Sequence, residues 1–327
     1  MTSETTSSTD ALPRIAPQQG MPEQVRIYEV GPRDGLQAEA VRVPTAVKAE
    51  FVRRLVDAGL TTIEVTSFVS PRWIPQLDDA HEVLTAVGPL DDIRLPVLVP
   101  NDRGLERALA AGAREVAVFA SATESFAKNN LARDVEGVLA MFEPVVRRAR
   151  AAGLPVRGYV SMCFGDPWEG DVEPRKVASV AHRLLDMGCT SLSLGDTIGT
   201  GTPGHVLELL DTVRGLGIPL ERTALHFHDT YGQALANVHA ALTAGVTEFD
   251  SSAGGIGGCP YARSATGNLA TEDLVWMLRG LGIHTGVDLN ALAATSRWMA
   301  HHLGRPSPSR VVTALARHCK CQNPHPR

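Results

Sequence analysis

The sequence predicts a single α/β catalytic domain, a (β/α)₈ TIM barrel with extra C-terminal helices. Short β-rich apolar runs alternate with amphipathic helical patterns, and a glycine repeatedly separates a helix from the next run. The runs begin near Val25, Thr61, Arg94, Glu115, Val156, Ser191, Thr223 and Glu248. These eight onsets span 223 residues in seven steps, about 32 residues per unit, which fits a barrel that divides ~250 residues among eight units.

The first unit shows this pattern most clearly. Val25–Val30 is a short β-rich strand, and the amphipathic helix at Thr45–Ala58 is closed by Gly59. The same helix-ending glycine recurs at Gly112, Gly153, Gly188 and Gly245, where a positive φ is commonly needed. An open doubly wound sheet is the alternative, but its GxGxxG fingerprint is absent, because the chain reads GPRDG after the first strand.

The pattern divides the chain into four segments. Residues 1–22 are expected to form a disordered tail, 23–283 the catalytic barrel, 284–318 a helical cap packed on the barrel, and 319–327 a flexible tail. Helical patterns near 272–281, 288–303 and 308–318 supply the last barrel helix and the cap.

Composition narrows the function classes. The 327 residues are 44% hydrophobic with a net charge of −5, which predicts a globular protein and disfavours nucleic acid or an anionic membrane as partner. No stretch approaches the ~18 apolar residues of a transmembrane helix, and the N-terminus lacks the features of a targeting signal. Five cysteines without a paired framework favour a reducing compartment, so a cytoplasmic location is expected.

Two histidines at the end of the seventh strand predict a metal site. His226 and His228 are one residue apart, so a strand points both imidazoles to the same side. Imidazole is a common metal ligand, although one histidine could instead be a hydrogen-bonded core residue. In a parallel barrel the carboxyl ends of the strands carry the reactive groups, which favours the metal role.

Polar groups at other strand ends extend this candidate site. Asp34, beside Arg33 after the first strand, would add carboxylate oxygens to the two histidines, although an Asp-Gly pair is also typical of a plain turn. Two histidines with such oxygen ligands suit Mg²⁺ or Mn²⁺, with Co²⁺ or Zn²⁺ as alternatives. Glu64 on the second strand and Asp196 at the end of the sixth are further acidic candidates. The sequence suggests no organic cofactor.

Cys259 is the candidate reactive thiol. It lies in the glycine-rich stretch GGIGGCPYA after the eighth strand, which predicts a mobile lid. Cys163 and Cys189, in apolar contexts, are expected to be buried structural residues. A thiol is mostly protonated at neutral pH, so Cys259 could donate a proton as readily as attack a carbonyl.

Several motifs together resemble the 3-hydroxy-3-methylglutaryl-CoA lyase family. They are EVGPRDGLQ, IEVTSFVSPRWIPQ, SLGDTIGTGTP, HFHDTYGQALAN, and GGCPYA followed by TGNLATEDLVWML. The similarity runs from about Val25 to about Arg310. The HxH and RDG elements are shared with isopropylmalate and homocitrate synthases of the same barrel superfamily, whereas GGCPYA and TSFVSPxWxPQ are more specific to the lyase.

The resemblance implies a site and a reaction. The implied metal ligands are Asp34, His226, His228 and Asn268. The implied catalytic residues are Arg33, Asp34, His226, Cys259, Glu64 and Asp196, and the substrate-binding residues are Arg33, Gln37, Thr197 and Lys128. The reaction is cleavage of 3-hydroxy-3-methylglutaryl-CoA, with Asp34 or His226 as the base. Lys128 could equally be a solvated surface cation.

The substrate and partners remain expectations. Ala38 and Ala40 stand where family members often carry an Asn and sometimes a Lys, so a bulkier 3-hydroxy-3-alkylglutaryl-CoA is an alternative substrate. A Claisen condensing synthase is the closest rival activity, and a catalytically silent scaffold is a third hypothesis. The expected partners are an acyl-CoA and a second copy of the chain, with neither nucleic acid nor membrane.

Overall fold

Eight parallel strands form the centre of the molecule. The structure is a computed structural model that describes residues 12–259 and 262–321, with the side chains of residue 259 and of 262–266 and 317–321 outside the described part. The strands are β1 (Arg26–Glu29), β2 (Thr66–Ser67), β3 (Val97–Leu98), β4 (Val116–Ser121), β5 (Val156–Ser161), β8 (Ser191–Asp196), β9 (Thr223–Phe227) and β10 (Glu248–Ser251). Their order in the sheet is β1-β10-β9-β8-β5-β4-β3-β2. Each strand therefore pairs with the barrel strand that precedes or follows it in the sequence, and the first strand pairs with the last.

The sheet closes on itself. β1 is joined to the segment before β2 by a parallel bridge between Glu29 and Ile63, with Glu64 N–H donating to Glu29 O at 2.8 Å. A closed sheet leaves no free edge between the first and second units. The predicted TIM barrel is therefore confirmed, with strands beginning close to the eight expected onsets.

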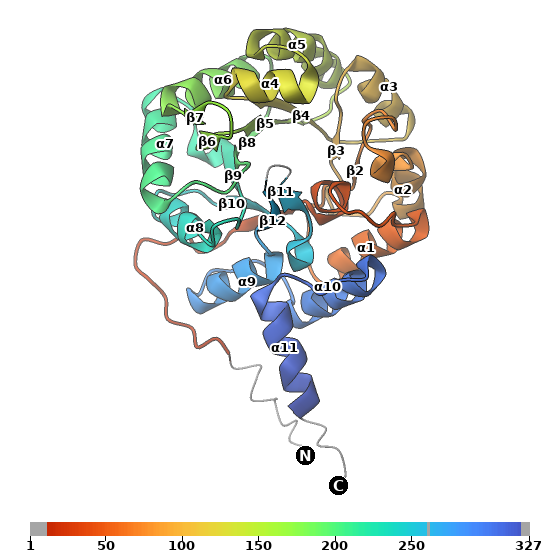
Figure 1. Ribbon diagram of the computed structural model, residues 1–327, viewed down its shortest axis with the longest axis vertical. Helices are drawn as coiled ribbons and strands as arrows, with labels where there is room; N and C mark the ends of the chain where they lie inside the picture. Colours follow the sequence, from red (N-terminus) through yellow and green to blue (C-terminus); the bar gives the residue numbers. More distant parts are fainter. Residues whose placement is uncertain (1–11, 260–261, 322–327) are drawn as a thin grey trace.

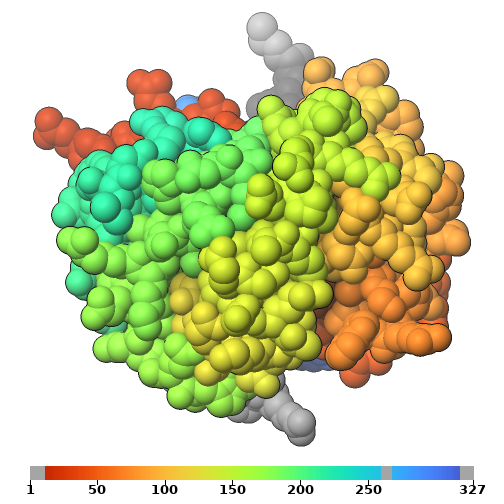
Figure 2. Space-filling view, turned by 90° about the horizontal axis from the view of Figure 1, so that it is seen from above, coloured from red at the N-terminus to blue at the C-terminus, as the bar shows by residue number. Residues whose placement is uncertain are grey.

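Helices surround this barrel, as Figure 1 shows. They are α1 (Thr45–Asp57), α2 (Ala80–Val87), α3 (Asp102–Ala110), α4 (Glu124–Leu131), α5 (Val135–Ala151), α6 (Pro174–Asp186), α7 (Pro203–Gly215), α8 (Ala234–Thr243) and α9 (Thr271–Gly280). Figure 2 shows one side of the ring, where the units coloured orange to cyan pack side by side.

Local signals set where these helices begin and end. Asn101 caps α3 by accepting the Gly104 N–H at 2.9 Å, and α6 and α7 each start with a proline, which suits the first helical turn. Gly59, after α1, has φ +94°. A Cβ there would lie 2.3 Å from the backbone oxygen of Gly286, so this junction requires glycine.

The C-terminal helices pack against one side of the barrel. α10 (Leu289–Leu303) lies beside α1, where the Arg54 guanidinium sits 4.6 Å from the ring centre of Trp298, and α11 (Arg310–Cys321) follows. The final helix runs to Cys321, three residues past the expected end of the cap at 318.

The N-terminal segment differs from the expected disordered tail. From residue 12 the chain is extended and contacts the barrel, with Ala16 N–H donating to Gly280 O at 2.8 Å and Gln18 Oε1 lying 3.0 Å from His239 Nε2. Backbone hydrogen bonding to the end of α9 orders part of this segment, which composition could not reveal. Within the described ranges, no helix is both long and apolar enough to span a membrane.

Buried charges fill the barrel interior below the site. Arg157 is 1% exposed and pairs with Asp250 at 2.5 Å and with Glu248, while its guanidinium lies 3.9 Å from the ring centre of Tyr28. A buried cation needs such partners to offset its lost hydration. Asp250 also lies 3.3 Å from His226 Nδ1, so it joins this ion-pair network to that histidine.

Candidate metal centre and active site

A tight turn after β1 presents the first two site residues. The turn, η1 (Gly31–Gly35), is a single π-helical turn whose Gly31 N–H donates to Glu29 Oε1 at 2.8 Å. A Cβ on Gly31 would lie 2.6 Å from that oxygen, so glycine lets the backbone approach the Glu29 carboxylate. The turn directs Arg33 and Asp34 to the carboxyl end of the barrel.

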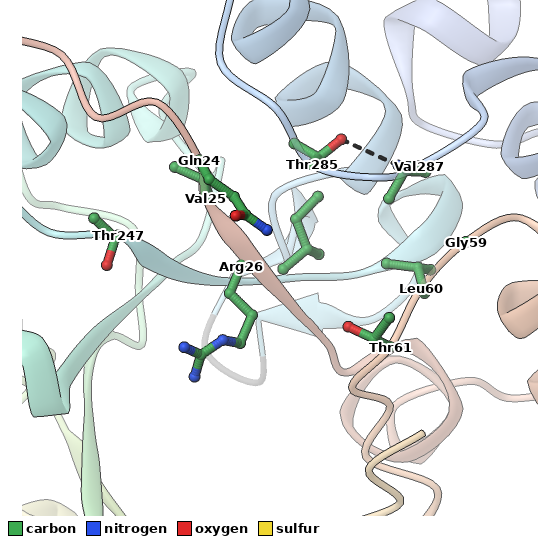
Figure 3. A pocket seen from close by; sticks show the side chains of 10 residues that line it. Gln24, Val25, Arg26, Gly59, Leu60, Thr61, Thr247, Thr285 and Val287 are labelled. Atoms are coloured by element: carbon green, nitrogen blue, oxygen red, sulfur yellow. Dashed lines mark hydrogen bonds between the residues drawn. The ribbon is translucent and has the colours of Figure 1, made fainter. Parts of the chain in front are cut away.

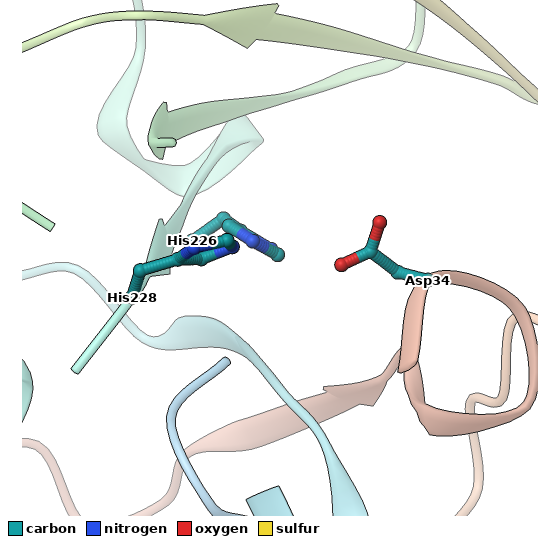
Figure 4. A group of neighbouring side chains, drawn as sticks. All are labelled: Asp34, His226 and His228. Atoms are coloured by element: carbon teal, nitrogen blue, oxygen red, sulfur yellow. The ribbon is translucent and has the colours of Figure 1, made fainter. Parts of the chain in front are cut away.

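Asp34, His226 and His228 form a group with the geometry of a metal site. Their candidate ligand atoms all lie within 4.8 Å of one another, and Figure 4 shows both imidazoles facing the Asp34 carboxylate. His226 belongs to β9 and His228 follows it, as the one-residue spacing predicts. The two ring centres are 5.1 Å apart.

The donor atoms of this group fit a divalent cation. Nδ1 of His228 and Oδ1 of Asn268 are buried and have no hydrogen-bond partner among the described residues. Buried polar atoms normally have partners, so unpaired atoms beside the Asp34 carboxylate suit a bound ion. Two imidazoles with carboxylate and amide oxygens suit a divalent cation and leave positions for substrate oxygens.

Asn268 lies beside Asp34. Its Nδ2 donates to Asp34 Oδ2 at 2.9 Å, and its backbone bridges that of His228. The side chain is 3% exposed. The resemblance placed Asn268 in this site, whereas the residue type alone is equally typical of a turn.

Electrostatics favour the ligand forms of two residues. Burial works to raise the pKa of Asp34, but Arg33 and then the histidines outweigh it and lower that pKa to about 2. Burial, aided by repulsion from His226, lowers the pKa of His228 to about 3. Asp34 is therefore ionised and His228 neutral at pH 7, as metal binding requires.

His226 has a carboxylate behind it. Its Nδ1 lies 3.3 Å from Asp250 Oδ2, within reach of the charge but without good hydrogen-bond geometry. Burial acts to lower the pKa of His226, and Asp250 outweighs it and raises that pKa. Sequence reasoning missed Asp250, although its place on β10, next to β9 in the sheet, could have indicated it.

Arg33 is held rigidly at the edge of this group. Its Nε donates to Glu64 Oε2 at 2.5 Å and its Nη1 to Asp34 Oδ1 at 2.7 Å, and the side chain is buried. The guanidinium lies 5.6 Å from the ring centre of Tyr159. Glu64 thus anchors Arg33, while its second oxygen, Oε1, is buried and has no hydrogen-bond partner among the described residues.

Asp196 and Thr197 end the strand β8. Asp196 Oδ2 accepts the Gly201 N–H at 3.0 Å, while Oδ1 is buried with no hydrogen-bond partner in the part of the chain that the structure describes. Burial raises the pKa of the carboxyl to about 6. Thr197 Oγ1 accepts the Met162 N–H at 2.8 Å. Thr197 therefore helps to fix the loop after β5. It also lies at the end of β8, where it is a candidate substrate-binding residue.

Gln37 and Lys128, the remaining candidate substrate-binding residues, differ in their exposure to solvent. Gln37, just after η1, is partly buried, whereas the Lys128 side chain on α4 is 64% exposed and 3.9 Å from Glu124. The structure thus leaves Lys128 on the helix surface. Cys163 and Cys189 are buried, which confirms their structural role.

Cys259 occupies a strand rather than a plain loop. β11 (Gly258–Cys259) pairs with the antiparallel β12 (Ala262–Thr266), and this hairpin lies over the barrel opening in Figure 1. The backbone of Cys259 is described but its side chain lies outside the described part. The short hairpin was not predicted, because its strands carry no apolar alternation.

A second hollow lies at the opposite end of the barrel. It has a volume of about 290 Å³ and is shown in Figure 3. The side chains of Gln24, Arg26, Thr61, Thr247 and Thr285 line it, at the amino ends of the strands. Because barrel chemistry occurs at the carboxyl ends, this hollow is separate from the metal centre.

Comparison with known proteins decides the family. Residues 24–299 match the HMGL-like family. This chain belongs to the HMGL-like family. It is 54% identical over 298 residues to the mitochondrial hydroxymethylglutaryl-CoA lyase of Arabidopsis thaliana, covering 91% of this chain and 64% of that protein. It is 50% identical to the cytoplasmic 3-hydroxy-3-methylglutaryl-CoA lyase of Rattus norvegicus, covering 90% of this chain and 86% of that protein.

Solved structures agree with the fold of this HMGL-like chain. Hydroxymethylglutaryl-CoA lyase from Pseudomonas aeruginosa superposes with a TM-score of 0.90 at 48% identity, covering 91% of this chain and 99% of that one. An HMG-CoA lyase from Acinetobacter baumannii, in complex with coenzyme A and 3-methylmalate, gives a TM-score of 0.85 at 37% identity, covering 95% and 100%. The HMGL-like resemblance found in the motifs is confirmed.

Proposed function

We propose that this chain is a metal-dependent carbon–carbon lyase that cleaves 3-hydroxy-3-methylglutaryl-CoA to acetoacetate and acetyl-CoA. The main support is the gathering of Asp34, His226 and His228, within 4.8 Å of one another, at the mouth of an HMGL-like barrel. Relatives and solved structures that carry the lyase name cover about nine-tenths of the chain.

The reaction must manage two proton transfers and one bond cleavage. The C3 hydroxyl loses its proton, its electron pair forms the ketone, and the C2–C3 bond breaks to leave the enolate of the acetyl thioester. Carbon C2 then takes up a proton. A divalent cation held by Asp34, His226, His228 and Asn268 would supply Lewis-acid stabilisation of the developing negative charge.

Arg33 is the proposed stabiliser of the enolate oxygen. Its fork is fixed by Glu64 and Asp34, so the positive charge is in place before the reaction and does not have to reorganise. Its buried surroundings exclude much of the water that would otherwise screen it.

Two groups are placed to accept the hydroxyl proton. Asp34 has one oxygen toward Arg33 and one toward Asn268, and His226 has Asp250 behind it to stabilise an imidazolium. Cys259 is the proposed donor to C2, since a protonated thiol on the hairpin over the barrel is suited to quench a carbanion. Asp196, at the end of β8, is a further acidic residue at the carboxyl end of the barrel.

The remaining expectations are proposed with this function. The metal is Mg²⁺ or Mn²⁺, the partner is an acyl-CoA, and the assembly is a homodimer. A cytoplasmic location is also proposed; relatives are named for both the cytoplasm and the mitochondrion. Gln37, Thr197 and Lys128 are proposed to touch the CoA ester.

A bulkier acyl group is the second candidate substrate. A Cβ built on Gly258 would lie 3.8 Å from the Ala38 side chain, so Ala38 lies beside the strand that carries Cys259. A small residue at this place leaves room that a longer side chain would fill. A 3-hydroxy-3-alkylglutaryl-CoA with a longer branch could therefore enter.

The test is a product assay with purified protein. Mg²⁺ and 3-hydroxy-3-methylglutaryl-CoA should release acetoacetate and acetyl-CoA in equal amounts. Turnover of a longer-branched analogue without acetoacetate release would support the second substrate instead. Net condensation of acetyl-CoA with a 2-oxo acid would favour a synthase, and no turnover of any of these would favour a scaffold.

A further inference from the structure

The base of the cysteine-bearing hairpin is held by three carboxylates from separate parts of the chain. This base, residues 253–257, connects β10 to β11. Its backbone N–H groups donate outward: Ala253 to Glu29 Oε1 at 2.8 Å, Gly254 to Glu272 Oε2 at 2.8 Å, and Gly257 to Glu39 Oε1 at 3.3 Å. A glycine-rich segment has high backbone freedom, so fixing it requires such contacts.

Glu29 links this base to the metal-bearing turn. The same Oε1 that accepts Ala253 N–H also accepts Gly31 N–H at 2.8 Å, and Oε2 accepts the Thr271 hydroxyl at 2.7 Å. The base of the hairpin and the turn that carries Asp34 are therefore both hydrogen-bonded to the Glu29 carboxylate at the end of β1.

Glu39 links the base to the C-terminal helices. Its side chain is only 9% exposed. Arg305 donates to it twice, through Nε to Glu39 Oε2 at 3.1 Å and through Nη2 to Glu39 Oε1. Arg305 lies just past α10, in the short connection to α11. A two-pronged guanidinium bond fixes the carboxylate in direction as well as in place.

The same connection touches the base a second time. Ser307 Oγ donates to Gly254 O at 2.8 Å, and a Cβ on Gly255 would lie 3.2 Å from Pro308. Residues 305–308 thus contact the base both directly and through Glu39. None of these residues faces the metal ligands directly in the contacts described above.

We propose that Arg305, acting through Glu39, is a positioning residue for Cys259, so the C-terminal cap sets the geometry of proton delivery in the proposed lyase. The inference rests on the proposed function. Gly257 lies two residues before Cys259, and the Glu39 contact is the last carboxylate anchor before the thiol. Loss of this anchor lets the strand shift, whereas Asp34, His226 and His228 share no described contact with Glu39 or Arg305.

The kinetic consequence follows from where the shift occurs. A misplacement of about 1 Å can cost up to ~10²-fold in rate, whereas substrate binding depends on groups that remain in place. We expect Arg305→Gln and Glu39→Gln each to lower kcat about tenfold and to change KM by less than about twofold. Arg305→Lys, which keeps the charge but loses the fork, should recover only part of kcat.

The matched control is Arg54→Gln. Arg54 also contacts the cap, by stacking on Trp298, but it touches no part of residues 253–257 among the contacts described. This variant should keep kcat within about twofold of the unsubstituted protein, since surface pairs contribute little. If the charge variants fold poorly, Ser307→Ala is the second test. It removes an uncharged contact and should also lower kcat.

A second readout does not depend on turnover. The alkylation rate of Cys259 by iodoacetamide, resolved from the other cysteines by peptide mass spectrometry, should rise at least about threefold in Arg305→Gln and Glu39→Gln, because the strand loses its anchor. The double variant should show no further rise beyond either single one, as expected for two residues of one unit.

The outcomes separate this inference from the proposed function. If the unsubstituted protein cleaves no acyl-CoA, the function fails, and the alkylation series still reports on the anchor. If Arg305→Gln, Glu39→Gln and Ser307→Ala match Arg54→Gln in kcat and in Cys259 alkylation, the positioning role is overturned.

Discussion

At the scale of single residues, the site depends on how neighbours fix the form of each side chain. His228 has a pKa lowered to about 3 by burial and by His226, so its imidazole is neutral, the form that metal binding requires. Asp34 is kept ionised, chiefly by Arg33 acting against burial. Substitutions at these positions should therefore change metal affinity and charge stabilisation separately.

The metal ligands can be tested without any activity assay. His226→Ala or His228→Ala removes one of the donor atoms that gather within 4.8 Å, so the affinity for Mn²⁺ should fall at least about tenfold. Isothermal titration with Mn²⁺ would measure it. His239→Ala, on α8 and partly buried beside Gln18, is the control and should bind Mn²⁺ as the unsubstituted chain does. Unchanged binding in both ligand variants would reject the site.

Arg33 can be separated from general charge effects. Arg33→Lys keeps the charge but cannot bond Glu64 and Asp34 together, so kcat should fall ~10²-fold or more. Arg26→Lys is the control. Arg26 is an exposed residue that pairs with Glu248 at the far end of the barrel, so this substitution should have little effect on kcat. Steady-state assays with the CoA ester compare the two, and equal rates for both would exclude a role for Arg33 in stabilising the enolate.

At this scale the sequence indicated the candidate metal-binding residues more fully than the residues that support them. The HxH spacing and the RDG turn carry a local signal, and the structure gathers Asp34, His226 and His228. Asp250, Glu29 and Glu39 were missed because each acts through a partner more than 200 residues away or on a neighbouring strand. Only folding brings such partners together.

At the scale of elements, buried carboxylates hold the segment between β10 and β11. Glu272 is 0% exposed, accepts Gly254 N–H and the Ser296 hydroxyl, and burial raises its pKa from 4.5 to about 8. Burial likewise raises the pKa of Glu29 to about 7. Near neutral pH the Glu272 carboxyl is therefore largely protonated, and the Glu29 carboxyl is protonated in about half of the molecules.

This gives a pH dependence of stability with a definite sign. The Glu272 pKa is higher in the folded chain than the value near 4.5 in the unfolded one, so its contribution is complete below about pH 4.5 and is lost as the pH rises through about 8. The Tm should fall between pH 6 and pH 9, and Glu272→Gln, which cannot ionise, should reduce that fall.

Scanning calorimetry across this pH range provides the measurement. Glu143→Gln, on the exposed face of α5, is the matched control and should leave the pH dependence unchanged. A Tm profile for Glu272→Gln that parallels that of the unsubstituted chain would show that the buried carboxyl does not supply this dependence.

At the scale of the whole molecule, the repeat pattern was sufficient to predict the barrel. Eight apolar runs, five of them preceded by a helix-ending glycine, correspond to the eight strands, and Gly59 has the positive φ that the pattern implied. The hairpin β11–β12 and the ordered residues 12–22 were not predictable in this way, because tertiary hydrogen bonds such as Ala16 to Gly280 organise them. The C-terminal helices were anticipated, but their contacts to the hairpin base were not.

Metal dependence of cleavage tests the central claim most directly. Protein stripped with EDTA and assayed with 3-hydroxy-3-methylglutaryl-CoA should release no acetoacetate, and readdition of Mg²⁺ or Mn²⁺ should restore release in the unsubstituted chain but not in His228→Ala. Acetoacetate release by the stripped protein at the same rate as with metal, or full activity in His228→Ala, would contradict the account.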